Sequence, residues 1–593
     1  MIKIAGRERR GETAAELIVE RLIDWGVTVV FGLPGDGING LMEALRVREE
    51  HIRFVQVRHE EAAAFMACGY AKYTGRIGVC LATSGPGAIH LLNGLYDAKL
   101  DGAPVLAITG QTYHDLLGMR YQQEVDLLSL FKDVALYNQQ LTGAMQARSL
   151  VDAACRAALS YGGVAHITCP VDLQEEKIAH DERSKKNIAG HTSDVWSPPI
   201  VVPRDAELRR AADLLNDGTK TVILAGQGAL GAADELERTA DLLAAPIVKP
   251  LLGKATVPDD SPFTTGGIGL LGTLPSELAL EECDTLLIVG SSFPYMEFYP
   301  KPGDARAVQI DRDPSRLGLR YPVEIGLTGD AKATLQALMP HLLQREKREF
   351  LEKAQQRMGE WRKLLDDRGS RADVPLKPQV VAHRLNTLLA DDAIVSADSG
   401  TIATWAARYI QVRRGQKFSL SGNLATMAPA LPYTIAAQIA YPDRQCVAIV
   451  GDGGFTMLMG EFATAVKYEL PITVVIFKNN TLGMIKWEQM VFLGNPEYGV
   501  ELQPIDFVRF AEACGGVGFR CEKPDEVEGA LQAALQSRRP ALVEAIVDPY
   551  EPPMPARVKL DQALKMAKAL ARGEPHRGRI ALTLFRDKVH ELF

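Results

Sequence analysis

The sequence lacks the features that mark several classes of protein. No apolar run approaches the roughly 18 residues of a membrane-spanning helix. The N-terminus MIKIAGRERRGE has no apolar core after its charges, unlike a secretory signal. The formal net charge of −8 over 593 residues gives no reason to expect a nucleic-acid partner. These absences favour a cytoplasmic location.

Paired cysteines are missing as well. The 8 cysteines are scattered and none forms a C-x-x-C pair, so we expect neither a zinc site nor a disulfide framework. The composition, with 47% hydrophobic and 24% charged residues, is ordinary for a soluble globular protein. The length predicts three or four domains of about 150 residues each.

Strands and helices alternate along almost the whole chain, which predicts an α/β fold of doubly wound parallel sheets. Polar stretches divide the chain into expected domains at residues 1–190, 195–345 and 375–555, followed by a helical tail at 556–593. The expected strands are VTVVFG, FVQV, IGVCLAT, PVLAITG and VAHITCP in the first block, TVILAG, PIVKP, TLLIVG and AVQID in the second, and AIVSAD, QCVAIVGD, TVVIFKN and ALVEAIV in the third.

Polar residues follow two neighbouring apolar runs of the third block. Asp452 follows the run 445–450, and Asn479 follows the run 471–477. Ligands bind at the carboxyl ends of parallel strands, so the two side chains should lie together at one edge of a sheet. A carboxylate and an amide oxygen suit a hard cation such as Mg²⁺, which takes further oxygens from phosphates. The pattern therefore predicts a magnesium site beside a phosphate-bearing ligand.

Other motifs have both a functional and an ordinary interpretation. Glu60 opens a helix after FVQV, where an isolated glutamate often only complements the helix dipole. SGPG (Ser84–Gly87) lets the backbone approach a ligand, or only forms a tight turn. GQGALG, with Gly226 and Gly228, has the context of a dinucleotide site but lacks the acidic residue expected about 20 positions later. Asp311 suits a ribose hydroxyl, or is an ordinary carboxylate at a strand end.

RHEEAA, SGPG, the GDG motif and KNNTLG occur together in the order and spacing of one family. The chain resembles the thiamine diphosphate enzymes of the pyruvate oxidase and acetolactate synthase group, from about Gly11 to about Leu560. Within that group it is most similar to the quinone-reducing type of pyruvate oxidase. The resemblance implies a pyrimidine-binding domain, a middle domain and a diphosphate-binding domain, in that order, with thiamine diphosphate and Mg²⁺ as cofactors.

The resemblance also implies roles for particular residues. Asp452, Asn479 and the backbone carbonyl of Thr481 would bind Mg²⁺. Glu60 would hydrogen-bond N1′ of the aminopyrimidine and so favour the tautomer that removes the C2 proton. In this family that glutamate and the diphosphate site come from different subunits, which implies a homodimer or homotetramer. The implied cofactor-binding residues of these two domains are Gly35, Ser84, Gly85, Met427, Gly451, Gly453, Gly454, Leu482, Gly483 and Met484.

The middle block resembles the FAD-binding domain of pyruvate oxidases through GLLG, GSSFPYMEFYP and QIDRDPSRLG. The arginine-containing segment usual in acetolactate synthases is absent there. The residues implied in FAD binding are Gly226, Gly228, Gly269, Gly272, Ser291, Phe293, Tyr295 and Asp311. The implied reaction is oxidative decarboxylation of pyruvate or a similar 2-oxo acid to acetate and CO₂, with electrons passed through FAD to quinone or oxygen. Release as acetyl phosphate, a carboligase of acetolactate synthase type with structural FAD, and a non-catalytic homologue stay open.

One departure from the family concerns the substrate. The family often has Tyr-Phe-Gln-Glu where this chain has YQQE at 121–124, so Gln122 replaces an aromatic residue and a more polar 2-oxo acid stays open. Gln123 matches the family glutamine that hydrogen-bonds the acid. His90 either orients the substrate or is an ordinary core histidine. Trp487 either lines the channel above the cofactor or only packs there.

The tail has a basic amphipathic pattern that is typical of a helix. The residues that set it are Ile580, Leu584, Val589 and Leu592, with Arg579, Arg586 and Lys588 between them. In the quinone-reducing relatives a C-terminal segment binds the membrane surface, so the resemblance implies peripheral contact with the inner face of the cell membrane. The alternative is a helix packed on its own domain.

Overall fold

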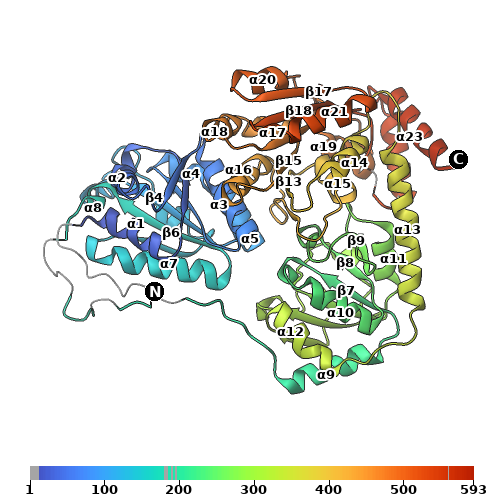
Figure 1. Ribbon diagram of the computed structural model, residues 1–593, viewed down its shortest axis with the longest axis horizontal. Helices are drawn as coiled ribbons and strands as arrows, with labels where there is room; N and C mark the ends of the chain where they lie inside the picture. Colours follow the sequence, from blue (N-terminus) through green and yellow to red (C-terminus); the bar gives the residue numbers. More distant parts are fainter. Residues whose placement is uncertain are drawn as a thin grey trace.

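Three six-stranded sheets form the framework of the molecule, and every strand pair within them is parallel (Figure 1). The computed structural model describes residues 12–178, 184–188, 191–193, 196–553, 555–557 and 560–592, with the backbone alone for 585–592. Helices flank each sheet, and the long helix α13 (Glu349–Gly369) runs alongside the second and third (Figure 1). The expected α/β fold is confirmed, whereas the domain boundaries stay predictions.

The first sheet is built from buried apolar runs. Its strands β1, β3, β4 and β6 are buried along their whole length, as a parallel sheet with both faces covered requires. From edge to edge the strands are β2 (Arg53–Gln56), β1 (Val29–Gly32), β3 (Gly78–Ala82), β4 (Val105–Gln111), β6 (Val164–Pro170) and β5 (Ala135–Gln140). The main helices are α1 (Ala14–Asp24), α2 (Asn39–Val47), α3 (Glu60–Thr74), α5 (Leu92–Asp101) and α7 (Ala147–Tyr161).

The second and third sheets have the same design. The second contains β12 (Ile325–Thr328), β11 (Arg306–Asp311), β10 (Thr285–Val289), β7 (Thr221–Ala225), β8 (Ile247–Lys249) and β9 (Thr264–Gly267), with helices α9 (Asp205–Asp217), α10 (Ala233–Leu243), α11 (Leu274–Glu282) and α12 (Ala331–Leu338). The third contains β14 (Lys417–Ser419), β13 (Ile394–Ala397), β15 (Cys446–Gly451), β16 (Thr473–Lys478), β18 (Ala541–Ile546) and β17 (Val517–Cys521), with helices α14 (Pro378–Leu388), α15 (Thr401–Tyr409), α16 (Ala430–Ala440), α17 (Asp452–Met457), α18 (Glu461–Lys467), α20 (Phe507–Ala513) and α21 (Pro524–Leu535).

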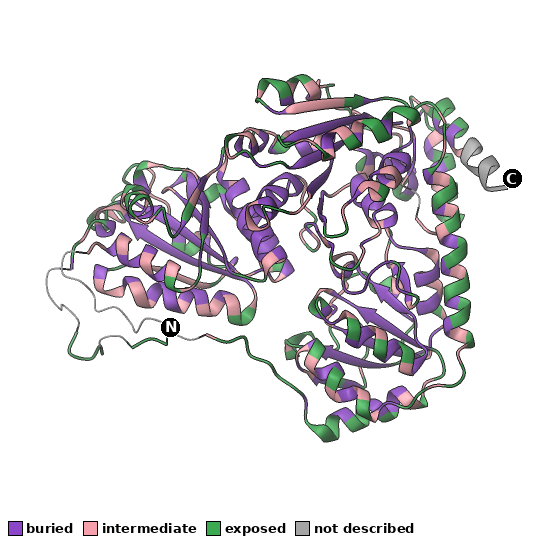
Figure 2. Ribbon diagram, in the orientation of Figure 1, coloured by how far each residue is buried: buried purple, intermediate pink, exposed green. Residues whose placement is uncertain are grey.

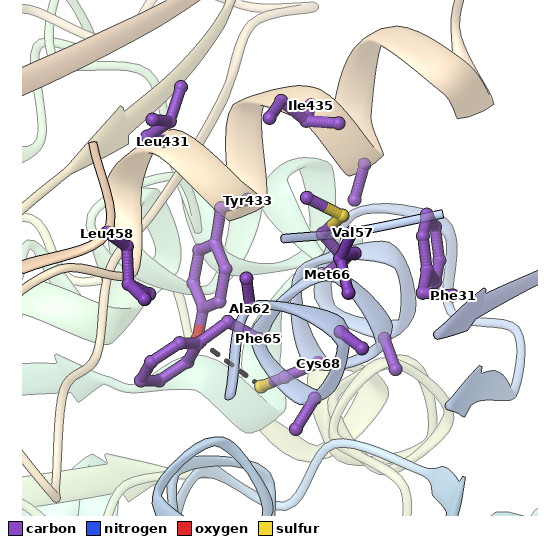
Figure 3. Close-up of a cluster of buried hydrophobic side chains, with 14 of the residues drawn as sticks. Phe31, Val57, Ala62, Phe65, Met66, Cys68, Leu431, Tyr433, Ile435 and Leu458 are labelled. Atoms are coloured by element: carbon purple, nitrogen blue, oxygen red, sulfur yellow. Dashed lines mark hydrogen bonds between the residues drawn. The ribbon is translucent and has the colours of Figure 1, made fainter. Parts of the chain in front are cut away.

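Helices α3 and α16 join the first and third domains in one core. Most of α3 is buried, as its purple ribbon shows (Figure 2). Phe65 of α3 meets Tyr433 of α16 edge-on, with ring centroids 6.4 Å apart (Figure 3). A Cβ at Gly69 would lie 2.8 Å from the Tyr433 ring, so glycine is what allows the two helices this close approach. The chain thus fixes its own first domain against its own third domain.

The tail folds back onto the third domain. Helices α22 (Leu560–Ala571) and α23 (Arg577–Leu592) follow one another, and Ile580 is fully buried in a cluster with Trp487 and Met566. The burial of Ile580 therefore supports the alternative that this helix packs on its own domain. Leu584 packs partly against the same cluster. The side chains of Arg586, Lys588, Val589 and Leu592 lie outside the described residues. Among the described helices, none is long and apolar enough to cross a membrane.

Candidate active site

Asp452 and Asn479 lie at the same edge of the third sheet. Strands β15 and β16 are parallel neighbours, and Gly451 pairs with Phe477, so the two strands end together. The Asp452 carboxylate accepts a hydrogen bond from the backbone N–H of Asn480 at 2.6 Å. The Asn479 side-chain oxygen accepts one from the N–H of Thr481 at 3.0 Å.

The oxygens at this edge suit a hard cation. Burial raises the pKa of Asp452 from 3.8 to about 6, so a cation bound there would relieve the cost of a buried charge. The Thr481 hydroxyl is buried and has no hydrogen-bond partner within the described part of the chain. The Thr481 carbonyl accepts the N–H of Gly483 at 2.9 Å, which leaves its second lone pair. The residues present therefore fit the predicted Mg²⁺.

Glycines leave the backbone beside this edge of the sheet without side chains. A Cβ at Gly453 would lie 3.0 Å from the Leu482 side chain, and a Cβ at Gly454 would lie 2.1 Å from Asp398 Oδ2. Asp398, which the sequence motifs did not single out, follows β13 and is fully buried. It accepts the backbone N–H of Ala428 at 3.0 Å, next to Met427. Burial raises the pKa of Asp398 from 3.8 to about 7.

One cavity of about 870 Å³ connects this edge with the middle domain. Predicted cofactor and metal residues that line it are Gly226, Gly228, Gly269, Ser291, Phe293, Tyr295 and Asp311 from the middle domain, and Met427, Gly451, Asp452, Gly453, Gly454, Asn479, Thr481, Leu482, Gly483 and Met484 from the third. Gly272 does not line this cavity, and a Cβ there would lie 2.5 Å from the Gly267 carbonyl oxygen. Trp487 lines the cavity and is also packed, with 4% of its surface exposed, so its packing is confirmed and its place above a cofactor stays a prediction.

Other lining residues were not predicted. Ser399 and Gly400 lie between β13 and α15, and Gly400 has a φ of 96°. Their sequence, ADSGT, repeats the strand–glycine–helix pattern of the GDG motif, so a signal existed. Glu488 lines the cavity from the end of α19 (Gly483–Glu488), and no spacing rule points to it.

The first domain also reaches the cavity, through Lys72 and Asp101, whose Nζ and Oδ2 atoms are 2.7 Å apart. Burial alone would lower the pKa of Lys72, but the carboxylates of Asp101 and Asp97 raise it. This ion pair therefore holds a charged lysine in the wall of the cavity. No motif in the sequence pointed to it, because its partners come together only in the fold.

The predicted residues of the first domain form a second group. His90 Nδ1 lies 2.9 Å from Glu60 Oε2, and the His90 ring stacks on His59 with centroids 4.4 Å apart. The Ser84 hydroxyl donates to the Gln123 side-chain oxygen at 3.0 Å. The His90 side chain is 44% exposed, so the interpretation as a core histidine is wrong.

The remaining members of this group surround the same turn. A Cβ at Gly85, whose φ is 59°, would lie 2.9 Å from the Gln123 side chain, and one at Gly35 would lie 2.5 Å from Thr83. Among the described residues that line the large cavity, none belongs to this group of Gly35, Glu60, Ser84, Gly85, His90 and Gln123. One chain therefore holds two separate groups of predicted site residues.

Comparison with known proteins shows the same three parts. Residues 12–130, 208–338 and 398–545 match the N-terminal TPP binding domain, the central domain and the C-terminal TPP binding domain of thiamine pyrophosphate enzymes. A Bacillus subtilis protein named only for containing thiamine pyrophosphate is 44% identical over 94% of this chain and 95% of its own. The pyruvate oxidase of Lactiplantibacillus plantarum is 33% identical over 93% and 92%. A "Probable acetolactate synthase large subunit" of Methanocaldococcus jannaschii is 33% identical over 91% and 92%.

Proposed function

The chain belongs to the thiamine pyrophosphate enzymes of the pyruvate oxidase and acetolactate synthase group, and we propose that within it the protein oxidatively decarboxylates a small 2-oxo acid. Pyruvate is the simplest substrate, acetate and CO₂ are the products, and quinone or oxygen accepts the electrons. The observation that carries the proposal is the single cavity that joins the Asp452 edge to the glycine turns and aromatic residues of the middle domain.

The Asp452 edge is the proposed diphosphate end. Asp452, Asn479 and Thr481 would hold Mg²⁺, and the bare backbone at Gly453 would meet the diphosphate. Met427 would contact the cofactor, and its Cε lies 3.5 Å from a Cβ built at Gly453. Thiamine diphosphate, when bound, supplies the electron sink on which a 2-oxo acid loses CO₂.

The middle-domain end is the proposed site of FAD, which would accept two electrons. Gly226 and Gly228 turn between β7 and α10, and Asp311 ends β11 on the same cavity. Burial raises the pKa of the Asp311 carboxyl, which a ribose hydroxyl bond would offset. Phe293 and Tyr295 provide aromatic surface, with ring centroids 5.5 Å apart. These groups match the needs of a dinucleotide with a flat ring system.

A complete site would need a second copy of the chain. Glu60 and its neighbours do not line the cavity that holds Asp452. In a homodimer with twofold symmetry, the Glu60 group of each copy would face the cavity of the other. Glu60 would hydrogen-bond the aminopyrimidine, while Gln123 and His90 would hold the substrate, with Gln122 beside them leaving room for a more polar acid.

A carboligase of acetolactate synthase type is the second candidate, because a synthase subunit and a pyruvate oxidase are equally similar to this chain. The test is an anaerobic absorption spectrum of the protein with thiamine diphosphate and Mg²⁺, before and after pyruvate. Bleaching of the visible flavin band would support the oxidase. A band that persists while CO₂ is released would favour the carboligase, and the absence of any flavin band would contradict the assignment of the middle domain.

If the band persists and no CO₂ is released, the same experiment is repeated with larger and more polar 2-oxo acids. Bleaching by one of them would keep the oxidase and assign the substrate to the Gln122 side of the site. Failure of every acid would support the remaining alternative, a non-catalytic homologue.

A further inference from the structure

Glu461 is a buried carboxylate of the third domain that contacts the first domain. It is the first residue of α18 and only 1% of its surface is exposed. Its Oε1 atom accepts the backbone N–H groups of Arg58 at 2.9 Å and of His59 at 3.0 Å. Its Oε2 atom accepts the Thr464 hydroxyl at 2.7 Å. Both oxygens are therefore committed, and one of them serves only the other domain.

The two N–H groups belong to the segment that leads directly into α3. His59 is the N-cap of that helix, and its ring nitrogen Nδ1 accepts the N–H of Glu61 at 3.2 Å. Glu60 is the first residue of the helix. The N–H groups at the start of a helix have no intrahelical acceptor to fix their peptide planes. What fixes the planes at Arg58 and His59 is therefore the carboxylate of Glu461.

We propose that Glu461 is a positioning residue that fixes the direction of Glu60 toward the aminopyrimidine. This inference rests on the role of Glu60 in the proposed function. Hydrogen bonds to an ionised acceptor are about twice as strong as neutral ones, so two of them hold the segment firmly. A displacement of about 1 Å at a proton-transfer site can cost roughly 100-fold in rate, which makes such a constraint consequential.

In the proposed dimer, the same carboxylate would also lie between two active sites. Helix α18 follows α17, whose first residue is Asp452, so only eight residues separate Asp452 from Glu461 along the chain. In Figure 1, α18 lies at the side of the third domain that faces α3 and α4 (Pro86–His90). In the proposed dimer, Asp452 and Glu60 of one chain serve different cavities. Glu461 would thus link Asp452 in the proposed Mg²⁺ site of one cavity to Glu60, which serves the other cavity.

The test measures exchange of the thiazolium C2 proton with solvent deuterium, by acid quench and NMR, in the enzyme saturated with thiamine diphosphate and Mg²⁺. Glu461→Ala is expected to slow exchange by roughly 10- to 100-fold while the cofactor stays bound. Glu461→Gln keeps a side-chain oxygen for both N–H groups and can donate to Thr464, so it is expected to stay within about threefold of wild type.

A matched control separates an effect on the position of Glu60 from an effect on the stability of the protein. Asp152, like Glu461, is a buried carboxylate, but it lies in the first domain, on the face of the sheet opposite α3, and it accepts hydrogen bonds from the side chains of Arg21 and Trp25. Asp152→Ala is expected to lower Tm without slowing exchange. If Glu461→Ala fails to fold, Glu461→Asp, which is one methylene short of the two N–H groups, takes its place with the same expected slowing.

Three results would overturn the inference. Wild-type exchange in a folded Glu461→Ala or Glu461→Asp protein would remove the positioning role, and so would equal slowing in Asp152→Ala. Glu60→Gln is measured in parallel. If it exchanges at the wild-type rate, the proposed role of Glu60 fails first, and this inference fails with it. Slow exchange in Glu60→Gln with normal exchange in Glu461→Ala would overturn the Glu461 role alone.

Discussion

The carboxyl ends of β15 and β3 each lead through a glycine-containing turn into a helix, yet their surroundings differ. After β15, the residues Gly451–Gly454 open α17, and Asp452 is only 5% exposed in a cavity shared with the middle domain. After β3, Ser84 and Gly85 open α4, and the nearby His90 side chain is 44% exposed. Of the two proposed half-sites, the one that contains Asp452 is thus enclosed and the one that contains Ser84 and His90 is open. In the proposed dimer, the open half would be completed by the second copy of the chain.

The largest expected effect belongs to the enclosed half. Asp452→Ala removes the carboxylate of the proposed Mg²⁺ site. The loss of thiamine diphosphate affinity should exceed the roughly 10- to 100-fold that changes behind a metal ligand cost. Titration calorimetry with Mg²⁺ present measures it. Asp443→Ala, which removes an exposed carboxylate before β15, is the control and should bind as wild type does. Unchanged affinity in Asp452→Ala would contradict the metal assignment.

The open half should affect turnover and not binding of the diphosphate. Glu60→Gln is expected to lower kcat by about 100- to 10,000-fold, because proton transfer by a placed group contributes that much. Thiamine diphosphate affinity should fall far less than in Asp452→Ala. The neighbouring Glu61, which accepts the Asn93 side chain at 2.7 Å, gives the control Glu61→Gln. Full activity of Glu60→Gln would refute its catalytic role.

The enclosed half should also carry a pH dependence. Burial raises the pKa of Asp398 from 3.8 to about 7, so the folded protein binds this proton more tightly than the unfolded chain does. The stability from this group is therefore full below its unfolded pKa and is lost as the pH rises through about 7. The loss is on the order of 4 kcal/mol.

Asp398→Asn cannot ionise, so its Tm, measured without cofactors, should fall less than that of the wild type between acidic and neutral pH. Its absolute Tm can differ from that of the wild type, because an amide replaces one carboxylate acceptor. The slope of Tm against pH is the decisive quantity. Equal slopes in the two proteins would show that Asp398 titrates in its ordinary range.

The smallest expected effect concerns the tail, which packs behind the enclosed half. Ile580 contacts the cluster that contains Trp487 and Val491, and both of these line the cavity. Ile580→Ala should destabilise this packing by about 2–4 kcal/mol and speed proteolysis of the tail. Leu582→Ala, on the same helix at a side chain 49% exposed, should change stability by less than about 0.5 kcal/mol. Equal proteolysis of the two variants would contradict this packing.

The strands that the sequence pattern missed have one thing in common. Each of the five is the outermost strand at an edge of its sheet: β5, β9, β12, β14 and β17. An edge strand pairs with a neighbour on one side only, and it needs no continuous apolar run. In β5, for example, Leu136 and Gln139 are exposed. The central strands, buried on both faces, were readable from their apolar runs.

The site residues that could be predicted are those whose sequence motif lies next to a predicted strand. The turn around Asp452 and the turn around Ser84 each follow a predicted strand directly, so they were found. Asp398 and Glu461 were not, because their importance comes from partners at Ala428 and at Arg58 that lie far away in sequence. The separation into two half-sites was implied by the family resemblance, and the residues that line the cavity are consistent with it.

The most direct test of the two half-sites is complementation between inactive variants. Glu60→Gln and Asp452→Ala chains are unfolded together, refolded as a mixture and assayed. If Glu60 and Asp452 of one chain serve different cavities, each mixed dimer contains one intact site, and random pairing restores about a quarter of wild-type activity. If both residues of one chain serve the same cavity, no mixed dimer has an intact site, and the mixture stays as inactive as its parents.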